Sequence, residues 1–447
     1  MTRRDVMRLM AAAGLGSAFA SRTVADEAVA GADVTAELKL IASSTAQRYP
    51  AVLSGGKVIQ PQRPLPIFHE TDVLVVGGGP AGFAAAVASA RTGVRTALIE
   101  RYGYFGGLWT GGLVLYVEPT HAKINNQWIK TTCGIGDELL RRLADIPGGI
   151  VHYGAGQRNP TSDPEATKYV MDEMITEAGV NLFLHCWGVD AIMDGSAIRG
   201  VVFESKAGRQ AIVAKVVIDA SGDGDVFAAA GAEHEQRLHA IGLVHRLGNV
   251  DRTDKQALGK SGIKNLGAET PLPGVTWINL RGPSANCLDV NELTRLELEH
   301  RRAIWKHVQR LRQTAGGEQA YLLQTAPQLG VRTSRLLAGA QKLMLADARA
   351  ARQFPDTIGV GGADWGPWPI PYGTLVPAKL DGLLAAGRCI CVDAKLIEDM
   401  RLIATCLVTG HAAGAAAAIA VQSKCRPRDI EISRLQKLLK DQGAYLG

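Results

Sequence analysis

The chain has 447 residues, of which 47% are hydrophobic and 21% charged, and its formal net charge is +6 at pH 7. This length and composition exclude a disordered chain and predict a globular protein of about two to three domains. The 49 basic and 43 acidic side chains nearly balance, so we expect no nucleic-acid partner. Beyond residue 20 no apolar run is both long and uninterrupted enough to span a bilayer, so we do not expect an integral membrane protein.

Residues 1–20 have the pattern of an export signal. Arg3 and Arg4 stand at the start, a short run of small apolar residues follows, and a small-x-small site ends it at Ala20. The adjacent arginines resemble a twin-arginine signal, whose translocation machinery carries folded proteins that often already hold a cofactor. We therefore expect a periplasmic or secreted protein; a disordered basic tail is the alternative.

The ordered chain is expected to begin near Ile67, after a linker or loose arm at 21–66 that is rich in Ala, Ser and Pro. Two short apolar runs, at 72–76 and 95–100, flank a stretch of helical composition at 83–92. Together they predict a β-α-β unit with strands buried in a parallel sheet.

Further elements follow along the chain. The capping box Ser-Asp-Pro-Glu at 162–165 predicts a helix that runs to Glu177. The segment 295–312 has charged and apolar residues at helical spacing and predicts a solvated amphipathic helix. A helix of small residues is expected to start at Gly410 and close the fold. Additional strands are expected at 180–186, 191–193, 200–204, 211–213, 215–219 and 383–386.

The turn between the first strand and the first helix reads Gly-Gly-Gly-Pro-Ala-Gly at 77–82. In this GxGxxG pattern Gly77 permits a tight turn, Gly79 lets the backbone approach a pyrophosphate, and Gly82 allows close packing of helix on sheet. Free N–H groups at the helix N-terminus favour the phosphates. Glu100 ends the second strand, where an acid accepts hydrogen bonds from a ribose. The whole context predicts a dinucleotide site.

NAD and FAD both use this unit, and three later segments favour FAD. A glycine-rich stretch at 101–112 could pass beside a pyrophosphate and ribityl chain. A strand at 215–219 ends in the polar turn Ala-Ser-Gly-Asp-Gly-Asp. The third segment, 386–414, contains Ala-Gly-Arg, a downstream arginine and Gly-His-Ala-Ala-Gly.

With these motifs, residues 67–420 resemble the FAD-dependent oxidoreductases of the glutathione-reductase-like superfamily, in particular a bacterial branch known only by that description. The resemblance implies bound FAD, assembled before export, with the N-terminus of the last helix directed at the flavin. The FAD-binding residues that it implies, together with their motif neighbours, are Gly77, Gly79, Pro80, Ala81, Gly82, Glu100, Arg101, Gly106, Gly107, Thr110, Asp219, Gly222, Asp223, Gly387, Arg388, Gly410 and Gly414.

The fold class implied is α/β, a Rossmann-like FAD-binding domain with a parallel sheet and an inserted α+β substrate domain. Residues 236–369 show few buried-strand runs, which favours a second domain there. We predict a discontinuous FAD-binding domain at 67–120, 160–235 and 370–447, and a substrate or cap domain at 121–159 and 236–369.

Departures from the superfamily pattern limit the chemistry. No cysteine pair follows the 101–112 stretch, which argues against thiol–disulfide chemistry, and no histidine lies between Arg101 and His121, so we expect non-covalent FAD. The sequence contains no second GxGxxG unit between a strand and a helix, so we do not expect a separate NAD(P)H domain. The seven cysteines lack metal-ligand spacing, so no metal site is expected. Cys389 and Cys391, in an apparent strand, are interpreted as buried thiols.

Three residues are candidates for catalysis. His411, in the expected first turn of the last helix, is the candidate for proton transfer, with a packing or capping role as the alternative. Arg401 resembles the arginine near the isoalloxazine, with a structural ion pair as the alternative. Arg332, together with Arg335, could clamp an anionic or hydroxylated substrate, or could begin a solvated helix.

The reaction we expect is two-electron oxidation of a small hydroxylated, amine or CH–CH substrate, with electrons passing to a quinone, a cytochrome or oxygen. One alternative is a flavin-dependent reductase supplied by a periplasmic electron donor. An NAD-binding dehydrogenase and a non-catalytic flavin electron-transfer subunit are the others.

Overall fold

The computed structural model describes residues 50–152, 158–363 and 365–447. The predicted export signal lies outside these residues. The chain divides into two compact units, one ending at Pro64 and the other beginning at Leu65. In the first unit, β1 (Val52–Ser54) and β2 (Lys57–Ile59) form a hairpin where we expected only a linker. Gly55 and Gly56 close it with positive φ angles, which is the geometry that a two-residue hairpin turn requires.

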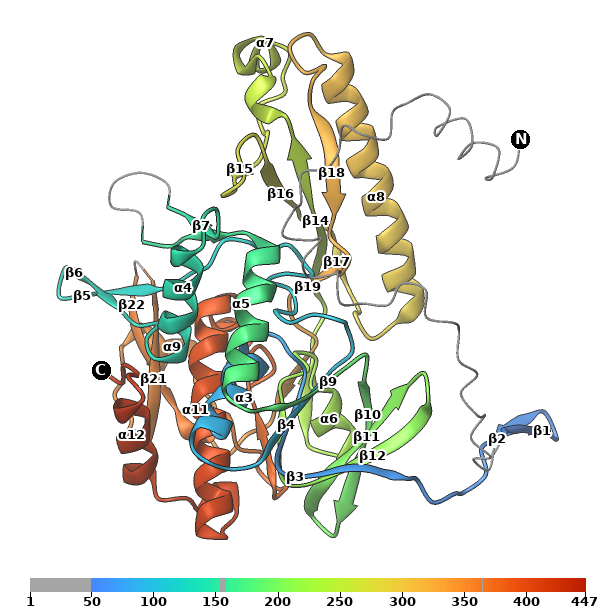
Figure 1. Ribbon diagram of the computed structural model, residues 1–447, viewed down its shortest axis with the longest axis vertical. Coiled ribbons are helices and arrows are strands. Elements are labelled where there is room, and N and C mark those ends of the chain that lie inside the picture. Colours follow the sequence, from blue (N-terminus) through green and yellow to red (C-terminus); the bar gives the residue numbers. More distant parts are fainter. Residues whose placement is uncertain (1–49, 153–157, 364) are drawn as a thin grey trace, which may run out of the picture. The chain divides into compact units, whose positions relative to one another are not determined.

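A seven-stranded sheet is the centre of the second unit (Figure 1). Its strands, in spatial order, are β10 (Trp187–Asp194), β11 (Ala197–Ser205), β12 (Gly208–Asp219), β3 (Ile67–Val76), β4 (Thr96–Glu100) and β9 (Asn181–Leu184), with β23 (Leu383–Ala385) paired to β12. The two strands predicted at 211–213 and 215–219 are one continuous strand, β12. Its first half pairs antiparallel with β11, and its second half pairs parallel with β3 and β23.

The parallel part of this sheet brings distant loops together. Strands β3, β4, β12 and β23 run in the same direction, so their carboxyl ends meet at one edge. The residues that follow these ends are those of the glycine-rich loop, the 101–112 stretch, the polar turn after Asp219 and Gly387. An edge of this kind is where open α/β sheets bind ligands. The α/β fold class predicted from the sequence is confirmed.

Helices α3 (Pro80–Arg91) and α11 (Ile403–Ser423) pack against each other and against the sheet. A Cβ atom on Gly410 would lie 2.0 Å from the carbonyl oxygen of Ala81, and one on Gly414 would lie 2.2 Å from that of Ala85. These two glycines therefore let the helix backbones approach. Among the described residues α11 is the one helix long and apolar enough to cross a membrane, and 94% of its apolar window is buried within the protein.

The prediction that the last helix starts at Gly410 is wrong. Helix α11 begins at Ile403, with Leu402 as its N-cap, so Gly410 and His411 lie about two turns inside it. In the sequence, a glycine at position 410 resembles a helix entrance, whereas the close packing of α11 on α3 is what requires it. Gly410 and Gly414 consequently line a contact between two helices, and their predicted role in FAD binding stays a prediction.

Two smaller predictions also need correction. Helix α5 (Pro164–Glu177) has Asp163 as its N-cap, accepting from the backbone N–H groups of Glu165 and Ala166, so the expected capping box led by Ser162 does not form. Cys389 and Cys391 lie in a turn rather than a strand. Both are buried free thiols, as predicted.

A second, six-stranded sheet lies within residues 236–369. It consists of β14 (His239–Gly248), β15 (Ala268–Glu269), β16 (Thr276–Leu280), β17 (Ser284–Ala285), β18 (Tyr321–Thr325) and β19 (Gly330–Val331). Strand β14 is almost entirely buried, contrary to the expectation of few buried strands. Helix α8 (Val290–Gln313) covers it, burying Leu296, Ile304 and Val308 while its other face stays exposed, which confirms the amphipathic helix (Figure 1).

Each of the two large sheets has its own cluster of buried hydrophobic residues. The predicted domain boundaries stay a prediction. The remaining helices are α4 (Ile135–Asp145), α6 (Asp225–Ala229), α7 (Lys255–Lys260), α9 (Leu345–Arg349), α10 (Ile397–Met400) and α12 (Ile432–Asp441). The remaining strand pairs are β5 (His121–Ile124) with β6 (Gln127–Lys130), β7 (Ile150–Val151) with β8 (Thr161–Ser162), β13 (His234–Gln236) with β20 (Arg335–Leu337), and β21 (Thr357–Ala363) with β22 (Gly366–Pro371).

Candidate active site

The glycine-rich loop forms a backbone cradle at the start of α3. Gly77 has a φ of 100°, a region that favours glycine. A Cβ on Gly82 would lie 1.7 Å from the carbonyl oxygen of Gly77, so helix and strand can approach only without a side chain there. Gly79 is the N-cap and no side chain caps the helix, which leaves the first N–H groups available to an anion.

The stretch after β4 packs directly on this cradle. The Gly106 N–H donates to the carbonyl oxygen of Gly78 at 2.8 Å. A Cβ on Gly107 would lie 3.1 Å from the Cα of Gly79. The buried hydroxyl of Thr110 donates to the carbonyl oxygen of Phe105 and so braces the turn. The sequence-predicted residues of these two segments therefore lie side by side.

Glu100 holds the two segments in place. Its carboxylate accepts from the N–H of Gly78 at 2.6 Å and from that of Tyr102 at 2.9 Å. Burial raises the pKa of Glu100, and these backbone hydrogen bonds oppose the rise. Each oxygen keeps a further lone pair, so the predicted contact with a ribose stays a prediction. Arg101, next along the chain, is exposed and stacks over Tyr102.

Asp219, at the end of β12, organises its own turn. Its carboxylate accepts from the backbone N–H groups of Val226 and Phe227, and from both the N–H and the hydroxyl of Ser221. The side chain is fully buried, and burial raises its pKa to about 6. Four donors satisfy the carboxylate, so Asp219 shapes the turn before α6, and its predicted contact with a cofactor stays a prediction.

A buried ion pair lies beyond this turn. Asp223 contacts Arg388 at 2.8 Å and accepts from the Ser334 hydroxyl at 2.7 Å. A Cβ on Gly222 would lie 2.7 Å from the Arg388 guanidinium carbon. Gly387, before this arginine, packs on the start of α3, where its Cβ would lie 3.0 Å from that of Ala81. The predicted residues from β12 and β23 thus meet the glycine-rich loop.

His411 does not belong to this cluster. It is buried on the side of α11 that faces Gly134, and its Nε2 lies 2.7 Å from the side-chain oxygen of Gln442. Burial lowers its pKa to about 4, against the hydrogen bond that the ring makes to the side-chain oxygen of Gln442, which raises it. The prediction that His411 transfers a proton at the flavin is wrong in its premise, because the residue is not in the first turn of the helix.

Replacing His411 by glutamine is expected to weaken the pH dependence of stability. The folded protein keeps His411 neutral down to about pH 4, whereas the unfolded chain takes up that proton near pH 6.5. The unfolding free energy of the wild type should therefore fall as the pH drops through this window, by about 3 kcal/mol for this group. Urea unfolding at several pH values measures the slope; an unchanged slope in His411→Gln would contradict this account.

Arg401 and Arg332, by contrast, are near enough for the charge of Arg401 to act on Arg332 and for both to act on Glu398. Arg401 is the C-cap of α10 and pairs with Glu398 through Nε at 3.0 Å. The other carboxylate oxygen of Glu398 lies 2.8 Å from Nε2 of His239. Burial lowers the pKa of Arg332, as do the charges of Arg401 and Arg281, while Glu398 opposes them.

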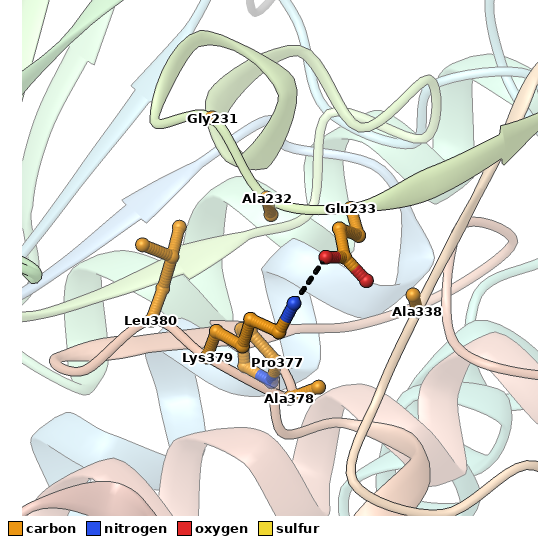
Figure 2. Close-up of a pocket in the computed structure, with 8 residues that line it drawn as sticks. All are labelled: Gly231, Ala232, Glu233, Ala338, Pro377, Ala378, Lys379 and Leu380. Carbon is orange, nitrogen blue, oxygen red and sulfur yellow. Dashed lines mark hydrogen bonds and ion pairs between the residues drawn. The ribbon is translucent and has the colours of Figure 1, made fainter.

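No signal in the sequence points to His239 or Glu398, since neither belongs to a recognisable motif. Arg335 is not free to act with Arg332, because it pairs with Asp225 at 2.9 Å. A separate cavity of about 70 Å³ lies between the 231–233 and 377–380 segments, with Lys379 and Glu233 paired across it (Figure 2). This volume is far too small for a dinucleotide or a substrate.

The geometry typical of one class of protein is therefore present: a Rossmann-type sheet edge with an uncapped helix N-terminus and glycines where the pyrophosphate of a cofactor must approach the chain. The residues fit FAD, since the nearest atom to a Cβ on Gly79 would be 4.0 Å away and the space beside it is open. The described residues contain no group of three or more His, Cys, Asp or Glu side chains that could bind a metal.

Comparison with known families agrees with this class. The sequence model of a family described as FAD dependent oxidoreductase matches residues 72–439. The chain belongs to this family, and it is an FAD-dependent oxidoreductase.

Three curated relatives match parts of the chain. Urocanate reductase of Eggerthella lenta is 33% identical over 96 residues, 21% of this chain and 14% of the reductase. Thiamine thiazole synthase of Methanococcus vannielii is 30% identical over 170 residues, 34% of this chain and 56% of the synthase. Digeranylgeranylglycerophospholipid reductase of Methanocaldococcus jannaschii is 26% identical over 232 residues, 48% of this chain and 54% of the reductase. The matches thus span between 14% and 56% of these relatives.

Solved structures resemble the chain over most of its length. A geranylgeranyl bacteriochlorophyll reductase-like protein from Thermoplasma acidophilum shares 15% identity with a TM-score of 0.46, covering 84% of both chains. The p-nitrophenol 4-monooxygenase of Pseudomonas putida shares 14% identity with a TM-score of 0.44, also covering 84% of both. At these values they indicate a distant resemblance of fold and nothing about activity.

Proposed function

We propose that this protein carries out two-electron oxidation of a small substrate that bears a carboxylate next to the reacting hydroxyl, amine or CH–CH group. Bound FAD supplies a two-electron acceptor. The observation that supports the substrate class is the repulsion between like charges at Arg332. The positive charges of Arg401 and Arg281 lower the pKa of Arg332, and the carboxylate of Glu398, which pairs with Arg401, opposes them.

The cluster is suited to an anion for a physical reason. Arg332 is part-buried, and one guanidinium nitrogen donates to the carbonyl oxygen of Ala240 at 2.8 Å. A planar guanidinium keeps further N–H groups for a carboxylate, which it binds in a forked geometry. Since burial and like charges disfavour its cationic form, an incoming anion would relieve the repulsion.

Reduction of a double bond is the second candidate, because two relatives are named as reductases, urocanate reductase and digeranylgeranylglycerophospholipid reductase. The same arginines would bind an unsaturated carboxylate, and electrons would then come from a periplasmic donor. The two candidates differ in the half-reaction that the purified protein performs: reduction of its flavin by a substrate, or oxidation of its reduced flavin by an unsaturated carboxylate.

The arginines are tested by kinetics on the flavin-containing protein. Anaerobic mixing with small hydroxy-, amino- and saturated carboxylates should bleach the flavin absorbance of the wild type with at least one class. For that substrate, Arg332→Gln should weaken binding by about 10- to 100-fold, the value of a charge-assisted hydrogen bond. Arg302→Gln, on the exposed face of α8, is the matched control and should bind normally. Equal binding by Arg332→Gln would rule out the carboxylate contact.

Export and electron acceptor belong to the same proposal. The adjacent arginines at residues 3 and 4 support twin-arginine export to the periplasm, with FAD bound before transport. A quinone, a cytochrome or oxygen would then accept the electrons. Fractionation of cells that express the full chain tests the location, and flavin-containing protein confined to the cytoplasm would contradict it.

A further inference from the structure

A groove on the surface of α8 shares no residue with the glycine-rich loop or with the arginine cluster. It runs between α8 and β18, which lie side by side in Figure 1, and has a volume of about 520 Å³. Trp305 and Leu322 supply its apolar surface, and Lys306 supplies a positive charge beside them. A groove of this size is in the range of ligand-binding sites, unlike the small cavity between Lys379 and Glu233.

The second half of α8 is strongly cationic. Between residues 300 and 317 the sequence has five lysine or arginine side chains and no aspartate or glutamate. The five cations, all of them exposed, are Arg301, Arg302, Lys306, Arg310 and Arg312. Of these five, only Arg301 forms an ion pair with a residue that the structure describes, which is Glu297 at 2.5 Å. The other four positive charges are therefore not neutralised within the described part of the chain.

Trp305 lies among these cations and is 55% exposed. Residues seven apart lie on the same side of a helix, so Leu298, Trp305 and Arg312 follow one another along the exposed side of α8. Leu298 is itself 49% exposed. An indole and an aliphatic side chain flanked by lysine and arginine are typical of surfaces at the boundary between water and a lipid bilayer.

We propose that this surface of α8 and β18 docks the protein on a bilayer that contains anionic lipids. Lipid phosphates would contact Lys306 and the neighbouring arginines, while the groove beside Trp305 would take the upper part of an acyl chain. An anionic lipid carries both of these groups in one molecule. A second copy of the chain fits poorly, because a two-fold contact would place the same cations against each other. The docking is independent of the substrate proposed above.

Sedimentation with vesicles tests the docking on the full FAD-containing chain. We expect binding to vesicles of phosphatidylglycerol mixed with phosphatidylcholine at low salt, and little binding to phosphatidylcholine alone. Because salt screens exposed charges, about 1 M salt should release the protein. The double variant Lys306→Gln with Arg312→Gln should bind about 25-fold more weakly, which is about 5-fold for each charge removed from the membrane surface.

The matched control removes the same net charge elsewhere. Lys206 lies in the turn between β11 and β12 and Lys440 lies in the last turn of α12, and both are exposed. The double variant Lys206→Gln with Lys440→Gln should therefore bind vesicles as the wild type does. All variants keep Arg3 and Arg4, so these cannot cause a difference between them. Flavin content and thermal unfolding should stay at the wild-type values, because every replaced side chain is exposed.

Trp305 gives a second readout that is independent of the cations. The emission of an indole moves to shorter wavelength when the ring passes from water into lipid. We expect this shift when the wild type meets anionic vesicles, and we expect Trp305→Phe to lose it although the other tryptophans of the seven remain. An unchanged shift in Trp305→Phe would contradict the contact between Trp305 and lipid.

Two results would overturn the docking surface. One is equal sedimentation of the wild type and the Lys306 and Arg312 double variant, which would place the lipid contact elsewhere. The other is a wild type that stays in solution with anionic vesicles at low salt, which would leave the groove to a soluble acidic partner. In both cases the proposed oxidation stands, because bleaching of the flavin by a carboxylate is measured without vesicles.

Discussion

Replacing Gly79 by alanine is expected to remove FAD from the purified protein while leaving its fold intact. The backbone φ at Gly79 is −66°, which alanine adopts freely. The nearest atom to an added Cβ would be the Cα of Gly107 at 4.0 Å, which is an ordinary van der Waals contact. The methyl group would therefore not clash with the protein itself. The methyl group would occupy the space through which a pyrophosphate approaches the helix N-terminus. We expect FAD affinity to fall by on the order of 100-fold.

Two further alanine variants complete the comparison. Gly82→Ala should lose both cofactor and stability, because its Cβ would lie 1.7 Å from the Gly77 carbonyl oxygen and helix α3 would have to move. Gly259→Ala, on α7, has no atom within 4 Å of the added Cβ and should behave as the wild type. Flavin absorbance per protein and thermal unfolding measure the two effects. Full flavin content in Gly79→Ala would contradict the proposed path of the pyrophosphate.

Replacing Arg388 by methionine is expected to cost about 3 to 5 kcal/mol of unfolding free energy, because it leaves Asp223 without its cation in a buried position. The two side chains are only 17% and 18% exposed, so water can replace the guanidinium only in part. Urea unfolding in excess FAD measures the loss. The double variant Arg388→Met with Asp223→Asn should recover most of it, since no uncompensated charge remains.

The pH dependence of this pair has a definite sign. Burial alone would raise the pKa of Asp223, but the charge and hydrogen bonds of Arg388, with that of Ser334, lower it overall. The pair therefore stabilises the protein above the ordinary aspartate pKa of about 3.9, and this contribution is lost on acidification below it. Arg209→Met, which breaks an exposed pair with Glu204, is the control and should cost about 1 kcal/mol or less. A similar small cost for Arg388→Met would contradict the buried-pair account.

Much of the core could be predicted because local pattern and tertiary role coincide there. The apolar run at 72–76, the glycine-rich turn and the run at 95–100 became β3, the start of α3 and β4. Short strands buried on both faces carry a continuous apolar signal, and the glycines are required by close backbone contacts that recur wherever this unit forms. A local pattern does not show which strands pair at long range or in what register. The sequence therefore predicted β12 as two separate strands.

The candidate catalytic residues were harder to predict, because their roles depend on which face of an element they occupy. His411 follows a glycine that resembled a helix entrance, yet two turns of α11 precede it and its ring faces Gln442. Asp219 stands at the end of a strand, where a cofactor ligand is expected, yet its carboxylate accepts hydrogen bonds from backbone N–H groups of its own turn.

The amino-acid sequence by itself determined the class of cofactor and the sheet edge predicted to bind it, because glycine spacing, strand composition and the terminal acid are local properties. The tertiary structure alone decided which charged groups share a site. Arg332, His239 and Arg401 come from three separate segments, and only the packing of the second sheet against the end of α10 brings their charges within reach of Glu398. Electrostatic interaction depends on distance in space rather than along the chain, which is why no spacing in the sequence announced this cluster.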